Sequence, residues 1–307
     1  MVKKGKKSSV SNDNMKVTAI VAVLFLASVV LLLSLPKSKE ASRPKKVLPV
    51  SKVLKSSPVV KSVKPVPLPV ISSTPLVVTK VPSPSGGKIA IILDDWGQSL
   101  GNCKYLKEIP EPLAVSILPG LRHTKDVAHC AVLYNKMTML HLPLEALYNN
   151  DFYPSDYVIK TTMTTALVQK ILDADLSQLP SIEGVNNHMG SKATGDKTLM
   201  KIIFKRLKRK GLFFVDSMTA RNSVCAGLAG EMDLAFGKRD VFLDNVNTKE
   251  AIIKQIMVLA QRARRKGYAV AIGHDRHLTM QVLKEQIPLL EAQGFEIVSI
   301  KDLLKKR

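Results

Sequence analysis

The chain has 307 residues, 46% of them hydrophobic, and its 46 Lys and Arg against 25 Asp and Glu give a formal charge of +21. This composition allows a sizeable core, and the length suits two domains or one α/β barrel of roughly 200–250 residues. Residues 1–86 hold 15 of the basic residues and only two acids, so much of the charge excess lies outside the part that can fold. The charge is therefore weak evidence for nucleic-acid binding, and three Cys without a CxxC pair exclude a disulfide scaffold and a zinc finger.

A basic tail, residues 1–16, precedes a stretch of 19 uncharged residues at 17–35. This stretch has the length of a transmembrane helix and exceeds the 7–15 apolar residues of a cleaved signal peptide, which favours an uncleaved anchor. Lys residues on both sides leave the orientation undecided by charge. The short tail favours export of the rest, so we expect a single-pass anchor in a bacterial inner membrane, with the remainder facing the periplasm or the outside.

Residues 36–86 are expected to form a linker, because ten of the 17 prolines occur at or before Pro84, mixed with Ser, Val and Lys. Such a segment cannot bury a core and favours extended polyproline II. A spacer is the simpler interpretation. The alternative is a basic arm that contacts an anionic wall polymer or lipid.

From Gly87 to the end, residues 87–307, short apolar runs alternate with helical patterns, which predicts a mainly parallel α/β sheet, open or closed. The predicted strands are 88–93, 113–118, 137–140, 182–185, 212–215, 241–243, 268–272 and 296–299. The clearest predicted helices are 166–176, 198–209, 249–265 and 280–292. Two of these helices end in basic residues followed by Gly211 or Gly267, which is ordinary helix-stop chemistry.

Polar residues follow most of the predicted strands. They are Asp94 and Asp95, His141, Asn186 to His188, Asp216 and Ser217, Asp244 and Asn245, and His274 and Asp275. The C-terminal ends of parallel strands share one edge, and that edge carries the active site in parallel α/β architectures. Any single Asp here is also explained as a helix cap. The six segments together predict one polar crevice.

The adjacent carboxylates Asp94 and Asp95 are the strongest single sign of a site, because like charges this close raise one pKa while a second group stays ionised. Neighbouring side chains of a strand point to opposite faces, so both serve one site only if the strand ends there, and Gly97 permits such a turn. An Asp with His141 and His188 is a plausible three-ligand set for zinc or a similar ion that leaves a position for water.

These residues resemble those of the divergent polysaccharide deacetylase family, which is similar to the NodB-type carbohydrate esterases. The resemblance covers residues 87–305 and rests on six blocks: IAIILDDWG (89–97), HLPLEA (141–146), GVNNHMGSKAT (184–194), FFVDSMT (213–219), VFLDN (241–245) and AIGH (271–274). It implies a distorted (β/α) barrel of about seven strands with a divalent metal, zinc before others, at the C-terminal mouth.

The resemblance also implies residue roles. Asp94 becomes the general base, Asp95 a metal ligand and His274 the general acid. The family's H-x-x-x-H motif appears here as His141-x-x-x-Glu145, so its second His is missing, and His188 from the next strand is expected to replace it. Asp275 stands where the family has Pro after Gly-His, and it adds charge beside the metal. The Arg-Pro-Tyr motif is absent, which leaves Asn186 or Asn187 for the oxyanion site.

The leading hypothesis is therefore a metal-dependent deacetylase of an acetylated cell-envelope polysaccharide. Asn186, Asn187, Glu145, Asp216, Asp244, Asn245 and Asp275 are expected to support the site or bind substrate, and no nucleic-acid partner is expected. One alternative is a glycan- or protein-binding scaffold without catalysis on the same barrel. Another is a glycosidase, because paired carboxylates also hydrolyse glycosidic bonds. The sequence leaves open the pairing of Cys130 or Cys225 in an exported domain.

Overall fold

The computed structural model describes residues 86–148, 155–179 and 181–304. The basic tail 1–16, the expected membrane span 17–35 and the linker up to residue 85 lie outside these residues. Among the helices of the described ranges, none is long and apolar enough to span a bilayer. The anchor at 17–35 therefore stays a prediction.

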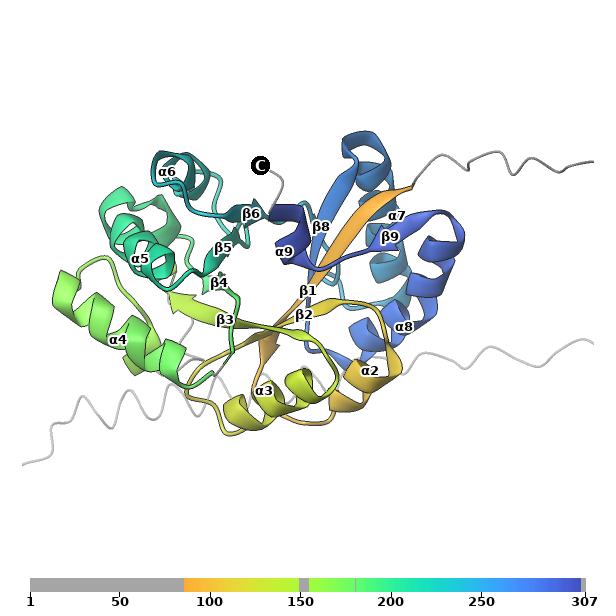
Figure 1. Ribbon diagram of the computed structural model, residues 1–307, viewed down its shortest axis with the longest axis horizontal. Helices are drawn as coiled ribbons and strands as arrows, with labels where there is room; N and C mark the ends of the chain where they lie inside the picture. The colour runs from red at the N-terminus through yellow and green to blue at the C-terminus, as the bar shows by residue number, and fades with distance from the viewer. Residues whose placement is uncertain (1–85, 149–154, 180, 305–307) are drawn as a thin grey trace, which may run out of the picture. The chain divides into compact units, whose positions relative to one another are not determined.

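The described chain forms a parallel sheet of nine strands surrounded by helices (Figure 1). The strands are β1 (Gly87–Trp96), β2 (Leu113–Ile117), β3 (Met137–Leu144), β4 (Gly184–Met189), β5 (Phe213–Asp216), β6 (Phe236–Lys238), β7 (Val241–Phe242), β8 (Tyr268–His274) and β9 (Phe295–Ile297). The helices are α2 (Cys103–Glu108), α3 (Thr124–Leu133), α4 (Thr165–Ser177), α5 (Lys197–Arg209), α6 (Cys225–Glu231), α7 (Lys249–Lys266), α8 (His277–Ala292) and α9 (Ile300–Leu304), with short 3-10 turns η1 (Ser155–Tyr157) and η2 (Ala193–Gly195).

The strand order is β6-β5-β4-β3-β2-β1-β8-β7, and β9 pairs with β1 beside this path. The sheet curves into a half-barrel with the longer helices on its outer side and the short α9 in its opening (Figure 1). The predicted parallel α/β barrel architecture is confirmed at this level. The resemblance implied about seven strands, and the structure has nine. The sequence pattern had indicated eight of them, β7 included, and missed only β6, which has three residues.

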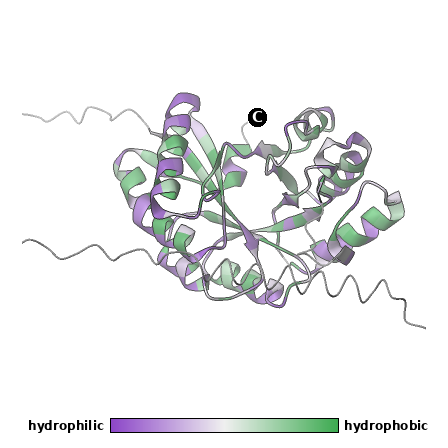
Figure 2. Ribbon diagram, turned by 180° about the vertical axis from the view of Figure 1, so that it is seen from behind, coloured by the Kyte–Doolittle hydropathy of each residue, from purple (hydrophilic) through white to green (hydrophobic). Residues whose placement is uncertain are grey.

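The sheet separates two apolar layers. On β1, Ile89, Ile91 and Leu93 face the large core beneath the helices, while Ala90 and Ile92 face the inside of the half-barrel. The inner layer is completed by residues of the same orientation on the other strands and on α9: Ala114, Met139, Phe213, Val215, Val270, Ile272 and Ile300. Figure 2 shows strands that are largely hydrophobic and helices banded with polar and apolar residues, as expected when only one helix face is buried.

The helix ends follow local capping rules. The side chains of Thr164, Asp196 and Thr248 accept the first free backbone N–H groups of α4, α5 and α7. At its C-terminus, α7 has three basic residues and then Gly267 in the left-handed conformation. The predicted helix-stop role of the basic runs is confirmed.

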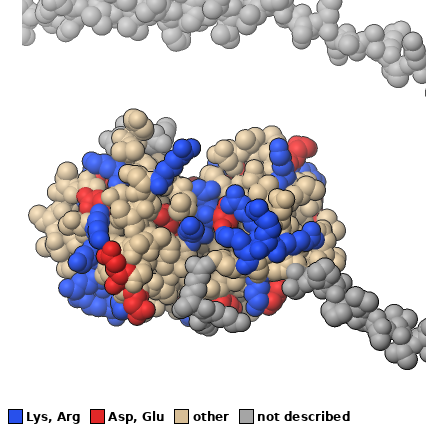
Figure 3. Space-filling model, turned by 90° about the horizontal axis from the view of Figure 1, so that it is seen from above, with Lys and Arg blue, Asp and Glu red and all other residues tan. Residues whose placement is uncertain are grey.

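The surface charges are mixed. Figure 3 shows Lys and Arg gathered in groups on one face, with Asp and Glu between them. Some of the opposite charges form ion pairs, such as Lys266 with Asp240.

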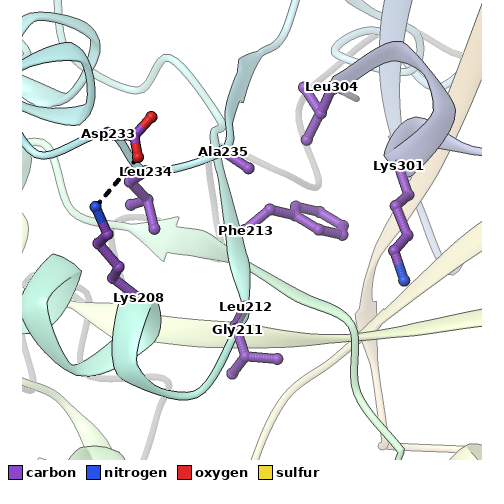
Figure 4. Close-up of a pocket in the computed structure, with 9 residues that line it drawn as sticks. All are labelled: Lys208, Gly211, Leu212, Phe213, Asp233, Leu234, Ala235, Lys301 and Leu304. Carbon is purple, nitrogen blue, oxygen red and sulfur yellow. Dashed lines mark hydrogen bonds and ion pairs between the residues drawn. The ribbon is translucent and has the colours of Figure 1, made fainter. Parts of the chain in front are cut away.

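A cavity of about 250 Å³ lies where β5 begins, between the C-terminal end of α5 and α9. Figure 4 shows Phe213 at its centre, with the ion pair of Lys208 and Asp233 on one side and Lys301 on the other. None of the predicted site residues lines this cavity. It opens at the N-terminal end of β5, whereas catalytic groups in parallel barrels gather at the C-terminal ends.

The buried carboxylate of Asp175 on α4 yields a stability prediction. Neither of its oxygens has a hydrogen-bond partner in the described structure, and burial raises its pKa to about 7 from an ordinary value near 3.8. The folded state thus holds a proton that the unfolded state loses above about pH 4. We expect the contribution of Asp175 to the free energy of unfolding to fall as pH rises from about 4 to 7, by at most about 1.4 kcal/mol per pH unit, and to level off above this range.

The variant Asp175→Asn removes the titrating group and keeps its size. Urea unfolding of both proteins from pH 4 to pH 8 is expected to show the variant gaining stability relative to the wild-type protein as pH rises. A constant difference between the two across this range contradicts a raised Asp175 pKa.

Candidate metal centre

The polar site continues the inner apolar layer of the half-barrel toward the C-terminal ends of the strands. Two residues beyond Ile92, Ala114, Met139, Val215 and Ile272 stand Asp94, Ser116, His141, Ser217 and His274. Because side chains alternate between the faces of a strand, these residues also face inward. Strand pairing aligns them, with Asp94 beside His274 and His141 beside Asn186. The six segments predicted to meet at one edge do meet there.

Asp95 reaches the same site although its neighbour Asp94 already points inward. Its φ is +64°, in the left-handed region, and the register between β1 and β2 shifts between Leu93 and Trp96. This bulge turns the Asp95 side chain toward the site. The sequence argument expected the strand to end and Gly97 to make the turn, whereas the strand continues to Trp96 and Asp95 itself adopts the unusual backbone conformation.

Asp95, His141 and His188 form a three-residue cluster suited to a metal ion. His188 Nδ1 lies 3.0 Å from Asp95 Oδ1, His141 Nε2 lies 3.2 Å from the same oxygen, and the two ring nitrogens are 3.3 Å apart. Tetrahedral ligands at about 2.0–2.1 Å from zinc are about 3.3–3.4 Å from one another. The three atoms thus already have the spacing of one face of such a tetrahedron. Two imidazoles and one carboxylate are also a donor set that zinc accepts.

The Asp95 carboxylate is held in its charged form. Burial opposes this, but the hydrogen bonds from His141 and His188 outweigh burial and keep the pKa of Asp95 well below its usual value. An ionised carboxylate is the form that binds a metal. His188, which the sequence predicted as the replacement for the missing second His of the H-x-x-x-H motif, is placed where that prediction requires.

Asn186 is fully buried and connects the metal cluster to Asp94. Its Oδ1 lies 2.9 Å from His141 Nδ1, and its Nδ2 donates to Asp94 Oδ1 at 2.8 Å and to Ser217 Oγ at 3.2 Å. An acceptor on Nδ1 keeps a proton there, so when Nε2 gives up its own proton its lone pair is available to a metal. Ser116 donates to the same Asn186 oxygen.

The amide groups are therefore not oxyanion donors. Both N–H groups of Asn186 are used inside the protein, and Asn187 Nδ2 donates to Met189 O at 2.7 Å while its Oδ1 accepts from Ser217 N at 2.9 Å. The oxyanion role expected for Asn186 or Asn187 is not supported. Their observed role is to fix the ends of β4 and β5.

Asp94 is buried beside the cluster, with its Oδ2 3.7 Å from His141 Nε2. Burial raises the pKa of Asp94 above its usual value, and the nearby His141 and the Asn186 hydrogen bond offset only part of that shift. Asn186 occupies one oxygen, so the other is directed toward the space beside the cluster. This is the position expected of a general base.

His274 also lies beside Asp95, with its Nε2 3.8 Å from Asp95 Oδ2. Its Nδ1 is 2.8 Å from Asp244 Oδ1, and its backbone N–H donates to Asp244 Oδ2 at 2.9 Å. Thr279 also donates to Asp244 Oδ2, at 2.7 Å. Burial opposes ionisation of Asp244, but the contacts with His274 and Thr279 lower its pKa. Asp244 is thus an ionised, fixed partner that directs Nε2 of His274 into the site.

Asp275, the residue after His274, joins the end of β8 to β1 and to the residue before α2. Its backbone N–H donates to Asp94 O at 2.8 Å, and its side chain accepts from Asn102 Nδ2 at 2.7 Å. Burial raises the pKa of Asp275 to about 6, assisted by the charge of Asp95 and opposed by the Asn102 hydrogen bond.

Of the other predicted supporting residues, Glu145 and Asp216 have structural partners. Glu145 accepts from Thr161 N and Oγ1 and pairs with Lys192, so its carboxylate ties two loops together. Asp216 accepts from Met218 N at 2.7 Å and Ser223 Oγ at 2.6 Å, and it shapes the loop after β5. Asn245 is exposed in the loop after β7.

Three residues of the site were missed by the sequence analysis: Ser116, Thr279 and Arg239. Ser217 was named among the polar residues after the strands but was given no role. Arg239 donates to the backbone oxygens of Ser217 and Met218 at 2.7 and 3.0 Å, and its positive charge acts on Asp94. It follows β6, a strand that the sequence pattern did not show. Ser116 carries a signal that was present, because it is the one polar residue of the otherwise apolar strand β2.

Residues 91–304 match the family model described as divergent polysaccharide deacetylase. This match covers more than half of the chain. The chain belongs to the divergent polysaccharide deacetylase family. The resemblance inferred from the six sequence blocks is thereby confirmed.

Two curated relatives also match about two thirds of this chain. The chain is 30% identical over 201 residues to protein YibQ of Escherichia coli K12, described as uncharacterized, and the match covers 66% of this chain and 62% of that protein. An uncharacterized protein of Haemophilus influenzae is 30% identical over 197 residues, which cover 64% of this chain and 70% of that one. The chain thus aligns with less than two thirds of the E. coli protein.

The fold is also similar to that of a solved structure. An uncharacterized protein from Agrobacterium tumefaciens, ATU2773, superposes with a TM-score of 0.68 at 19% identity, covering 71% of this chain and 89% of that one. At this identity the likeness establishes the fold alone.

Asn186 yields the prediction of this site. Asn186→Ala removes the acceptor that fixes the His141 ring, so we expect zinc affinity to fall about 10–100-fold, measured by competition with a chromophoric chelator. Asn245→Ala is the matched control, since this amide is exposed and is expected to leave affinity unchanged. Circular dichroism establishes that both variants fold. Wild-type affinity in folded Asn186→Ala contradicts the role of Asn186.

Proposed function

We propose that the protein is a metal-dependent deacetylase that removes acetyl groups from a cell-envelope polysaccharide. The observation that carries this proposal is a three-residue metal cluster with two proton-transfer groups beside it. Asp94 lies on the His141 side of the cluster and His274 on the Asp95 side. Membership of the deacetylase family supports an acetylated carbohydrate as substrate.

Asp95, His141 and His188 would hold the divalent ion, for which zinc is the first choice because of the donor set. When bound, such an ion supplies polarisation of the acetyl carbonyl and a lower pKa of water. The chain's own contribution starts with Asp94, which takes the proton of the attacking water through its Oδ2. A buried base with a raised pKa accepts this proton more readily than an exposed carboxylate does.

His274 then donates a proton to the leaving amine or alkoxide. Asp244 accepts from Nδ1 and keeps the ring oriented, so the proton moves at Nε2. The negative charge of Asp244 also stabilises the protonated ring. Asp94 and His274 thus divide the two proton transfers of acyl transfer between two groups that both lie beside the cluster.

The missing second His and the absent Arg-Pro-Tyr motif are the two grounds for a non-catalytic scaffold, and the position of His188 removes the first of them. The glycosidase alternative needs two carboxyl groups with access to one glycosidic bond. Asp95 is instead engaged by two imidazoles. These contacts favour the deacetylase over both alternatives.

The proposed localisation is an inner membrane, with residues 17–35 as the anchor and residues 36–86 as a spacer. This arrangement brings the barrel to polymers of the envelope on the periplasmic or outer side. It rests on the apolar stretch and the Pro-rich composition of the sequence.

Acetate release tests the proposal. The purified, zinc-loaded protein is incubated with N-acetylated and O-acetylated envelope oligosaccharides, and acetate is measured enzymatically. We expect release from at least one class, and a loss of about 10²–10⁴-fold in Asp94→Asn because the general base is gone. Asp233→Asn makes the same chemical change at a fully exposed carboxylate and is expected to retain activity.

Two outcomes contradict the proposal. New reducing ends without acetate would indicate a glycosidase. A metal-loaded protein that binds these glycans but releases no acetate would indicate a scaffold.

A further inference from the structure

Two of the three cysteines lie together at the contact between α2 and α3. Cys103 begins α2 and Cys130 lies in α3, and the Cys130 thiol donates to the Cys103 backbone oxygen at 3.9 Å. Both side chains are partly exposed, and both are free thiols, whereas Cys225 is buried. After burial, the direct interaction with Cys130 is the next largest cause that raises the pKa of the Cys103 thiol, to about 12.

The helix that carries Cys103 is short and depends on tertiary contacts for its position. It spans six residues, its N-cap Asn102 makes no capping hydrogen bond, and only Tyr105 and Leu106 of the helix are buried. A helix this short is not stable without tertiary contacts. The packing of α2 on α3 is therefore important for its position.

The position of α2 affects the loop that carries His274. The Asn102 side chain donates to Asp275 at 2.7 Å, and Tyr105 Oη lies 3.3 Å from His277 Nδ1. Asp275 in turn binds Asp94 O through its backbone. One end of α2 is thus linked to the metal centre, and the Cys103–Cys130 contact lies beside that link.

We propose that Cys103 and Cys130 form a disulfide that fastens α2 to α3 and thereby fixes the Asn102–Asp275 contact. This inference does not depend on the deacetylase activity. It differs from the sequence expectation, which considered Cys130 or Cys225, because the fold brings Cys103 beside Cys130 and buries Cys225.

The oxidant is a disulfide-bearing partner, either a thiol–disulfide oxidoreductase or oxidised glutathione. The Cys130 thiolate attacks one partner sulfur, which forms a mixed disulfide and releases the other partner sulfur as a thiolate. The Cys103 thiolate then attacks Cys130 Sγ, and the second partner sulfur leaves. The two cysteines lose two protons and two electrons, and the partner disulfide is reduced to two thiols.

The test uses the full chain equilibrated with oxidised or with reduced glutathione. Remaining thiols are alkylated, and the cross-link is located by peptide mass spectrometry. We expect a Cys103–Cys130 peptide only in the oxidised sample. Because closing a loop of this length restricts the unfolded chain, the melting temperature is expected to rise by about 5–10 °C. Hydrogen exchange in residues 100–109 is expected to slow.

Cys130→Ser is expected to abolish the cross-link and the rise in melting temperature, whereas Cys225→Ser is expected to keep both. Thiols at Cys103 and Cys130 that stay free, or that carry glutathione without joining each other, would overturn the proposal. A cross-link that leaves the melting temperature and the exchange of residues 100–109 unchanged would also overturn the fastening role.

Discussion

The alternation of side chains along parallel strands is the constraint on which the site depends. Apolar residues such as Ile92, Met139 and Ile272 fill the inside of the half-barrel. Two residues further along the same strands, the inward positions are Asp94, His141 and His274. Since the strands pair in register, these polar groups lie in one layer directly above an apolar one. The catalytic candidates are therefore placed by the same contacts that hold the sheet together.

Two departures from regular structure complete the layer. The positive φ of Asp95 brings a second carboxylate from β1 to the inward face, which a regular strand does not allow. Asn186 then joins the metal cluster to Asp94 through both ends of its amide. Such a buried network is stable only when its polar atoms have partners. Ser116 donates to the Asn186 oxygen, and the Asn186 amide donates to Ser217 Oγ, so both ends of the amide have partners.

The features that could be predicted are those that depend on the local pattern of apolar and polar residues along the sequence. Strand–helix alternation indicated the parallel sheet, and polar residues after apolar runs indicated the edge where Asp94, His141 and His188 meet. The backbone turn at Asp95 was expected from Gly97 instead, because sequence pattern does not specify which residue adopts a left-handed conformation. Arg239 was missed because β6 is too short to show a period. The use of both Asn186 N–H groups depends on contacts across three strands, which no local pattern contains.

The central claim is that Asp95, His141 and His188 bind one divalent metal ion. Elemental analysis of the purified protein after zinc reconstitution and removal of excess metal tests it most directly, with His188→Ala and the exposed-site control His129→Ala beside the wild-type protein. The account predicts about one zinc per chain in the wild-type and His129→Ala proteins and a large loss in His188→Ala. A wild-type chain that retains no metal, or a His188→Ala variant that retains it fully, would contradict the account.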